Sequence, residues 1–427
     1  MMRSKALRNV DSRRNPRTEA ARVRMPLRIR HATRLRGLDR RRYCTDHCGR
    51  HKNTPGRATL MTMNYNLRTM MCGCAGCGPS GGFASTAVNR RRFLAGSTAA
   101  GLGMAGLGTA GLGSATAQPS GKPHRIDVHH HIVPPAQRKM NIERRGGKGG
   151  PRWSPEMSLE DMDKGGVAYS ITSILNPGPW YGKIEEPSRR LARECNDYAA
   201  KLRSDHPNRF GVFAAIAPVD VEGSLKEIEY AYGTLKAEGI ALWTSYDGKY
   251  LGNEIFVPVL EELNRRRAVV YVHPTPPECC AKVIGAVPPS AIEYATDTTR
   301  TVASLLFEKP GSAFKFPDIR WIWSHSGGTI PFLTSRFTRL AWERKMKNDP
   351  IAVLRRHHYE VAQGNTPGQL AALMKMVPIS QVMFGSDYPY RDAKEAADGV
   401  VAYKFSATDQ LAIDNGNALK MFPNVKV

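Results

Sequence analysis

From residue 124 onward, short apolar runs alternate with longer amphipathic segments. Apolar residues at every second position predict strands, and apolar residues at a 3.6-residue spacing predict helices. Eight runs predict strands: RIDVHHH (125–131), YSITSIL (169–175), FGVFAAI (210–216), GIALW (239–243), AVVYVH (268–273), IRWIWSH (319–325), HHYEVA (357–362) and VMFGSD (382–387). Eight strands alternating with helices predict an α/β fold of the (β/α)8 TIM-barrel type, with a doubly wound sheet as the alternative.

The first predicted strand ends in three consecutive histidines, His129, His130 and His131. Side chains alternate between the two faces of a strand, so His129 and His131 share one face and His130 points the other way. Two imidazoles on one face can reach a single metal ion, and the stretch therefore predicts half of a metal site. A surface cluster of histidines is the alternative, so the metal site needs partners elsewhere in the chain.

Such partners stand at the ends of other predicted strands. His273 ends the fifth strand, His325 the sixth and Asp387 the eighth. The carboxyl ends of the strands in a TIM barrel meet at one face, where the active site lies. Imidazole and carboxylate groups are the ligands that a zinc-like divalent ion prefers. The five side chains together predict a metal centre.

The formal charge of +24 is unevenly distributed along the chain. Residues 1–117 hold 22 Lys and Arg against 4 Asp and Glu, whereas the rest of the chain holds 40 against 34. Residues 1–60 are rich in arginine and lack apolar periodicity, which favours a disordered basic extension or a start codon assigned too far upstream over a nucleic-acid-binding arm. No nucleic-acid partner is therefore expected for the barrel.

The segment 61–117 has the pattern of an export signal. The pair Arg90–Arg91 precedes a run rich in glycine and alanine, and Ala115-Thr116-Ala117 has the small residues of a cleavage site. This arrangement is typical of the twin-arginine route and predicts a mature protein of residues 118–427, periplasmic or secreted. The run contains too little Leu, Ile and Phe for a stable membrane anchor.

Three cysteines remain in the predicted mature chain: Cys195, Cys279 and Cys280. Adjacent cysteines seldom bridge each other because the ring that they form is strained. We therefore expect three free thiols.

Five motifs carry a resemblance to a known family: IDVHHHIVPP, WSPEMSLEDMDKGGVAYSITS, YVHP, SHSGGTIPFLTSR and MFGSDYP. With these motifs the chain resembles the amidohydrolase superfamily over residues 124–423. It resembles in particular the branch that holds amino-carboxymuconate-semialdehyde decarboxylase and the resorcylate-type decarboxylases. The motif set is specific for the branch and less so for the reaction, because the branch also holds hydrolases and a hydratase.

The resemblance implies metal ligands at His129, His131, His273 and Asp387. Two-metal members of the superfamily usually carry a bridging lysine at the end of the fourth strand, where this chain has Trp243 and Thr244. We therefore expect one divalent ion, zinc as the first choice and manganese as the second.

Two further roles follow from the resemblance. It implies that His325 acts as the acid/base residue and that Arg336, eleven residues later, binds a substrate carboxylate. A guanidinium can hold a carboxylate through two parallel hydrogen bonds, although Arg336 could equally form a structural salt bridge. The branch often forms dimers, so a homodimer is an open expectation.

The loop after the second strand, LNPGPWYG, contains Trp180 and Tyr181. These rings are placed to line the substrate pocket, where Trp180 would pack against a flat substrate ring. Ordinary loop packing is the alternative.

Three functions fit these observations. The first is a metal-dependent, non-oxidative carboxy-lyase for a small aromatic or dienoic carboxylic acid, with proton transfer by His325 or Asp387. The second is a hydrolase of a lactone, amide or ester, in which metal-bound hydroxide attacks a carbonyl group. The third is a non-catalytic periplasmic binding protein, which the set of five strand-end side chains disfavours.

Overall fold

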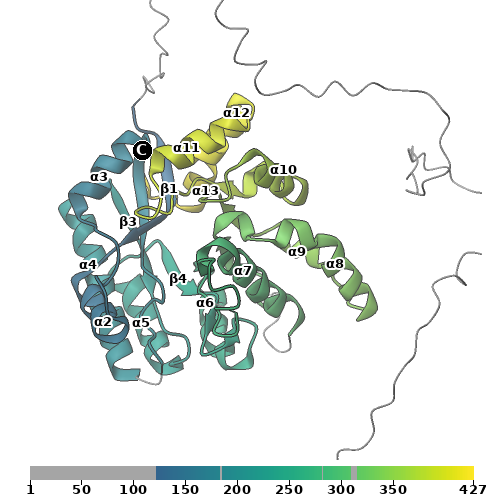
Figure 1. Cartoon of the computed structure of the whole chain (residues 1–427), viewed down its shortest axis with the longest axis horizontal. Helices are drawn as coiled ribbons and strands as arrows, with labels where there is room; N and C mark the ends of the chain where they lie inside the picture. The colour runs from purple at the N-terminus through teal and green to yellow at the C-terminus, as the bar shows by residue number, and fades with distance from the viewer. Residues whose placement is uncertain (1–121, 183–184, 281, 309–314) are drawn as a thin grey trace, which may run out of the picture. The chain divides into compact units, whose positions relative to one another are not determined.

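The computed structural model describes residues 122–182, 185–280, 282–308 and 315–427 (Figure 1). The basic extension, the export signal and the cleavage site predicted within residues 1–117 lie outside these described residues. Within the described ranges, no helix is both long and apolar enough to cross a membrane.

Eight parallel strands form the centre of the fold, in the spatial order β1-β2-β3-β4-β7-β8-β9-β10. Their bounds are Arg125–Ile132 (β1), Val167–Ile174 (β2), Phe210–Ala215 (β3), Gly239–Trp243 (β4), Val269–His273 (β7), Arg320–Trp323 (β8), His358–Glu360 (β9) and Val382–Met383 (β10). Each of the eight predicted runs overlaps one of these strands. The strand order follows the sequence without reversal, which confirms the barrel and rules out the doubly wound sheet.

Backbone hydrogen bonds connect β1 with the segment that follows β10. The amide of Val128 donates to the carbonyl of Phe384 (3.1 Å), and that of Asp387 donates to His129 (2.8 Å). The buried carboxylate of Asp127 accepts hydrogen bonds from the amides of His129 (2.9 Å) and Ser386 (3.1 Å). These bonds close the ring of strands and place the residues after β10 against the end of β1.

Helices surround the strands on the outside, as Figure 1 shows for α2, α4 and α5. Their bounds are Pro135–Arg145 (α2), Pro155–Lys164 (α3), Glu185–Asp205 (α4), Val221–Gly233 (α5), Val257–Arg265 (α6), Pro289–Phe307 (α7), Ile330–Glu343 (α8), Pro350–Leu354 (α9), Pro367–Met376 (α10), Ala393–Ala402 (α11), Ala407–Leu411 (α12) and Asn417–Met421 (α13). A small antiparallel hairpin, Ser245–Tyr246 (β5) and Lys249–Tyr250 (β6), follows β4.

The core explains why strands such as β4 (GIALW) and β7 (VVYVH) are almost continuously apolar. Both faces of each strand are covered, one by the barrel interior and one by helices, so residues of either parity are buried. On β8, Trp321 and Trp323 are both fully buried and stack with a 5.2 Å centroid separation. Burial on both faces makes the strands a rigid support for the side chains at their ends.

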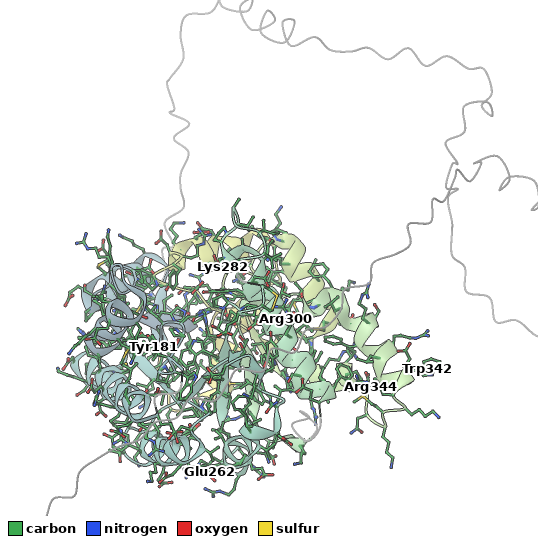
Figure 2. The ribbon with its side chains drawn as sticks, turned by 60° about the horizontal axis from the view of Figure 1, so that its bottom comes forward. Tyr181, Glu262, Lys282, Arg300, Trp342 and Arg344 are labelled. Carbon is green, nitrogen blue, oxygen red and sulfur yellow. A yellow bond between two sulfur atoms is a disulfide. The ribbon has the colours of Figure 1, made fainter. Side chains whose placement is uncertain are left out.

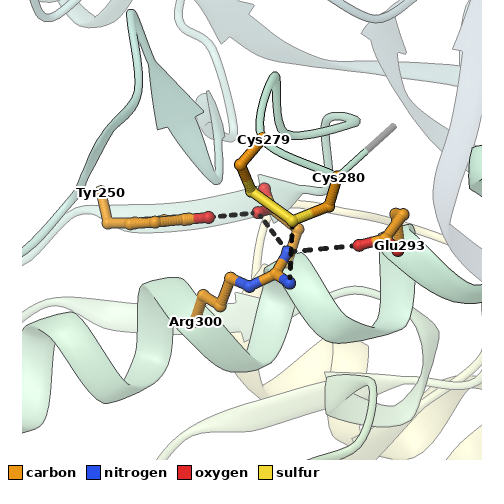
Figure 3. Close-up of a disulfide and its surroundings, with 6 residues drawn as sticks. Tyr250, Cys279, Cys280, Glu293 and Arg300 are labelled. Atoms are coloured by element: carbon orange, nitrogen blue, oxygen red, sulfur yellow. Dashed lines mark hydrogen bonds and ion pairs between the residues drawn. A yellow bond between two sulfur atoms is a disulfide. The ribbon is translucent and has the colours of Figure 1, made fainter. Parts of the chain in front are cut away.

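The prediction of free thiols is wrong for two of the three cysteines. Cys279 and Cys280 form a disulfide in the turn after β7, with a Cα–Cα distance of 3.8 Å (Figure 3). The chain around them is folded into tight turns, with the Cys280 amide donating to the carbonyl of Pro277 (3.1 Å), and Arg300 lies 3.7 Å from the Cys280 sulfur. This local folding brings the adjacent sulfurs together. Cys195 is buried and free, as expected.

A stability prediction follows from the closure of the barrel. Replacing Asp127 with Ala leaves several buried donors unpaired, and we expect the free energy of unfolding to fall by roughly 3 kcal/mol. Asp163→Ala, which removes only the exposed partner of Arg209, is the matched control and should change it by less than about 0.5 kcal/mol. Urea unfolding of the full chain, followed by tryptophan fluorescence, measures both. Equal losses in the two variants would contradict the role given to Asp127.

Candidate metal centre and active site

The two faces of β1 separate the three histidines. Nε2 of His129 and Nε2 of His131 lie 3.0 Å apart inside the barrel. His130 lies on the other face, where its ring stacks on Tyr388 at 4.9 Å and its Nε2 lies 2.9 Å from the hydroxyl of Ser158. The alternation of the strand thus gives two adjacent histidines on the inside and one structural histidine on the outside.

Four strand-end residues converge on one point: His129, His131, His273 and Asp387. One ligand atom from each lies within 4.8 Å of the others, and all four residues are buried. Oδ1 of Asp387 lies 3.2 Å from Nε2 of His129 and 3.2 Å from Nε2 of His131. The structure therefore brings together the four residues for which the sequence predicted a metal-ligand role.

The other ring nitrogen of each histidine has its own hydrogen-bond partner. Nδ1 of His129 lies 2.8 Å from Glu360, Nδ1 of His131 lies 3.1 Å from the hydroxyl of Ser173, and Nδ1 of His273 lies 2.7 Å from the carbonyl of Pro274. These partners fix the ring orientations and leave the Nε2 atoms for a metal ion.

The electrostatics of the cluster suit a cation. Burial and the neighbouring histidines hold the pKa of His273 well below its ordinary value, and burial lowers the pKa of His131. Burial alone would raise the pKa of Asp387, but His129 and His131 hold it well below its ordinary value. Burial would lower the pKa of His129, yet Glu360 and Asp387 raise it to about 10. Two neutral imidazoles and a carboxylate are thus in the protonation states of metal ligands, whereas His129 would have to release its proton to bind an ion.

One atom of the cluster is poorly satisfied without an ion. Oδ1 of Asp387 is buried and accepts no hydrogen bond with acceptable geometry from the described residues. A buried carboxylate oxygen facing imidazole Nε2 atoms is costly unless a cation or a proton lies between them. The donor set of three imidazoles and one carboxylate fits a divalent ion of the zinc or manganese type.

His325 lies beside this cluster, at the start of the turn after β8. Its ring centroid is 5.0 Å from that of His129 and 5.8 Å from that of His273. Its Nδ1 lies 2.9 Å from the carbonyl of Ala362, so Nδ1 carries a proton and Nε2 is the nitrogen that can exchange one. His325 and Asp387 both have left-handed backbones, with φ of 54° and 66°, a strain that is common at functional sites.

A cavity of about 350 Å³ opens onto the metal cluster. This volume is at the lower end of the range for small-molecule pockets, about 300–1,000 Å³. The wall combines aromatic rings, amides, a hydroxyl and one cation: Asn176, His273, Ser290, Tyr294, Gln363, Asp387, Tyr390 and Arg391. The tyrosine rings suit a small, flat molecule, and the wall carries one carboxylate, Asp387, and one guanidinium, Arg391.

Two predicted substrate-binding residues lie outside this wall. Arg336 is exposed on α8 and does not line the cavity. Trp180 is buried in a separate cavity of about 740 Å³, where its Nε1 donates to Asp247 (3.0 Å). Tyr181 lines this second cavity as well.

Sequence reasoning missed Glu360, Gln363 and Arg391. Glu360 ends β9, the seventh strand of the barrel. The rule that active-site residues lie at strand ends therefore points to it, but from the sequence that rule was applied only to other strands. The side-chain amide of Gln363 donates a hydrogen bond to Asp387, and Arg391 lines the cavity from the loop after Asp387. No motif or periodicity marks these two residues.

Similarity to known proteins agrees with this geometry. The sequence profile of the amidohydrolase family matches residues 126–423. The decarboxylase yanB of Aspergillus niger is 35% identical, over 71% of this chain and 88% of its own length. The 6-methylsalicylic acid decarboxylase of Penicillium expansum is 33% identical, over 71% of this chain and 97% of its own length.

A solved structure extends the comparison to the fold. The dihydroxybenzoic acid decarboxylase of Polaromonas sp., with bound manganese and the inhibitor 2-nitroresorcinol, superposes with a TM-score of 0.61 at 20% identity, covering 71% of this chain and 98% of that one. At this identity the likeness concerns the fold alone. Together with the family profile and the sequence relatives, it leads to one conclusion: the chain belongs to the amidohydrolase family.

Proposed function

We propose that the chain is a metal-dependent, non-oxidative decarboxylase of a small hydroxylated aromatic acid. The observation that carries the proposal is the cavity of about 350 Å³, which is lined by two of the four cluster residues, His273 and Asp387, and by two tyrosines and one arginine. Relatives that are 33–35% identical, and that this chain matches over 88–97% of their length, are named decarboxylases. Among the two acid classes expected from the sequence, they favour the aromatic one over the dienoic one.

The proposed cofactor is one divalent ion held by His129, His131, His273 and Asp387. Such an ion supplies a Lewis acid that polarises a substrate oxygen. Zinc was the first expectation from the sequence, and the manganese in structural neighbours makes manganese an equal candidate for loading.

Decarboxylation breaks the bond between the ring and the carboxyl carbon, releases carbon dioxide and requires a proton at the ring carbon. We assign this proton to His325, which is not among the lining residues of the cavity but whose ring lies 5.8 Å from that of the lining residue His273. Its Nδ1 is bound to the carbonyl of Ala362, which leaves Nε2 to exchange a proton. Asp387 is the weaker candidate among the two expected, since its low pKa keeps it ionised and Gln363 already donates to it.

Arg391 is the cation best placed to meet a substrate carboxylate. It lines the cavity beside Asp387, and its guanidinium forms no hydrogen bond or ion pair with the described part of the chain. Its amide donates to the carbonyl of Asp387 (3.2 Å), which fixes its backbone one turn beyond a proposed ligand. The exposed Arg336 does not reach this wall within one chain, so we assign the carboxylate contact to Arg391.

Hydrolysis of a lactone, amide or ester is the competing reaction, because the same metal ligands and the same histidine can serve it. The Arg391 guanidinium in the wall favours an anionic substrate and so favours decarboxylation.

Several expectations from the sequence remain proposals. The twin-arginine pair Arg90–Arg91 supports export to the periplasm or the medium. Trp180 would contact only substrates that extend into the second cavity. The exposed Phe332 and Trp342 on α8, the latter labelled in Figure 2, support the proposal of a homodimer.

The first prediction concerns turnover. The full chain loaded with manganese or zinc should release carbon dioxide from salicylic, methylsalicylic or dihydroxybenzoic acids, and His325→Asn should lower kcat by about 10²–10⁴-fold while the metal content stays unchanged. Gas release and bound metal are measured on the same samples. Hydrolysis of lactones or amides by a metal-loaded protein that releases no carbon dioxide would overturn the proposal.

The second prediction compares two arginines. Arg391→Gln should raise KM for the acid by about 10-fold or more with a smaller change in kcat, because it removes binding that the substrate and the transition state share. Arg336→Gln, an identical change on α8, is the matched control in the same steady-state assay. If Arg336→Gln raised KM and Arg391→Gln did not, the assignment of the carboxylate contact would be wrong.

The third prediction concerns the two faces of β1. His131→Ala should lose bound metal, whereas His130→Ala should retain it even though the loss of its stacking on Tyr388 lowers the melting temperature. Metal per folded chain, measured by elemental analysis, separates the two effects. Equal metal loss in both variants would contradict the proposed ligand set.

A further inference from the structure

We propose that Glu360 is a positioning residue that holds the metal ligand His129 and the acid/base residue His325 through one carboxylate group. The inference rests on the metal centre described under the proposed function and extends it to a residue that binds neither metal nor substrate. Glu360 ends β9 and is fully buried.

The hydrogen bonds of Glu360 are directed at both histidines. Oε1 lies 2.8 Å from Nδ1 of His129 and accepts a 2.7 Å hydrogen bond from the amide of His325. Oε2 accepts a 2.6 Å hydrogen bond from the amide of Ala362, whose carbonyl in turn lies 2.9 Å from Nδ1 of His325. Glu360 therefore reaches His325 twice, through its backbone and through the residue that orients its ring.

The surrounding backbone is shaped to admit this carboxylate. A Cβ added to Gly385 would clash with Oε2 of Glu360 and would lie 3.0 Å from Cβ of His129. The glycine of the FGSD segment is thus required for space, since any side chain there would push Glu360 and His129 apart.

Glu360 differs from the partners of the other two histidine ligands. His131 and His273 meet a neutral hydroxyl and a neutral carbonyl, whereas His129 meets a carboxylate. A carboxylate bound to Nδ1 makes Nε2 of the same ring a better electron donor to a metal ion and fixes the direction in which Nε2 points. His129 should therefore contribute more to metal affinity through its partner than His131 does.

Glu360 could instead be a ligand itself, because His129, His325 and Glu360 offer three donor atoms within 4.8 Å of one another. That arrangement would break the hydrogen bonds of Oε1 with His129 and His325. If an ion also occupied the site of His129, His131, His273 and Asp387, the His129 ring would have to bind two ions, one through each nitrogen. The existing contacts therefore favour a hydrogen-bond acceptor over a ligand.

The test is a metal titration of the full chain that does not depend on turnover. Metal-free wild type, Glu360→Gln and the matched control Ser173→Ala are titrated with Mn²⁺ and with Zn²⁺ against a competing chelator, and the apparent Kd and the stoichiometry are measured. We expect one ion per chain throughout, an affinity about 10–100-fold lower for Glu360→Gln, and a smaller loss for Ser173→Ala. His130→Ala shows how far a structural defect alone changes the Kd.

An unchanged Kd in Glu360→Gln would overturn the inference. It would also be overturned if the wild type bound two ions and Glu360→Gln bound one, because Glu360 would then be a metal ligand. If Glu360→Gln does not fold, Glu360→Asp is the variant that tests the inference. It keeps the negative charge but moves the carboxylate away from His129, so it should also weaken metal binding. A weakened Kd in a protein that decarboxylates no aromatic acid would leave this inference standing and refute only the proposed function.

Discussion

The pairing of β1 with the segment after β10 is the constraint on which the site depends. The Asp387 amide bonds to the carbonyl of His129, so the last predicted ligand is fixed to the backbone of the first. Asp127 adds a buried carboxylate that holds Ser386 to the same strand. A barrel that failed to close here would lose the metal cluster as well as its sheet, because the same few bonds make both.

The second constraint is electrostatic. Three imidazoles and two carboxylates are buried together at the end of the barrel, and each charge there must be matched. The low pKa of His273 and of Asp387 gives the cluster neutral and anionic donors that face each other. A divalent cation held by these donors, as proposed, would match the charges of this buried polar group.

The sequence was most informative where geometry is periodic. Alternation along β1 distinguished His129 and His131 from His130, and the rule of strand ends collected His273, His325 and Asp387 from distant parts of the chain. Loop residues carry no such period. The position of Arg391 depends on how the turn after Asp387 folds, and that of Arg336 on how far α8 extends from the cluster. Adjacent cysteines seldom form a disulfide, and the one between Cys279 and Cys280 depends on local turns that the sequence pattern does not reveal.

What separates a decarboxylase from a hydrolase on this scaffold lies in the wall rather than in the metal. The same ligands can activate water or polarise a substrate oxygen, so they do not choose between the reactions. Decarboxylation needs a proton donor aimed at carbon and a wall that draws in an anion while leaving little room for water. In the proposed function, His325, held by Glu360 and Ala362, would provide the first, and the cavity with Arg391 in its wall would provide the second. On this proposal, residues outside the ligand set decide between the two reactions.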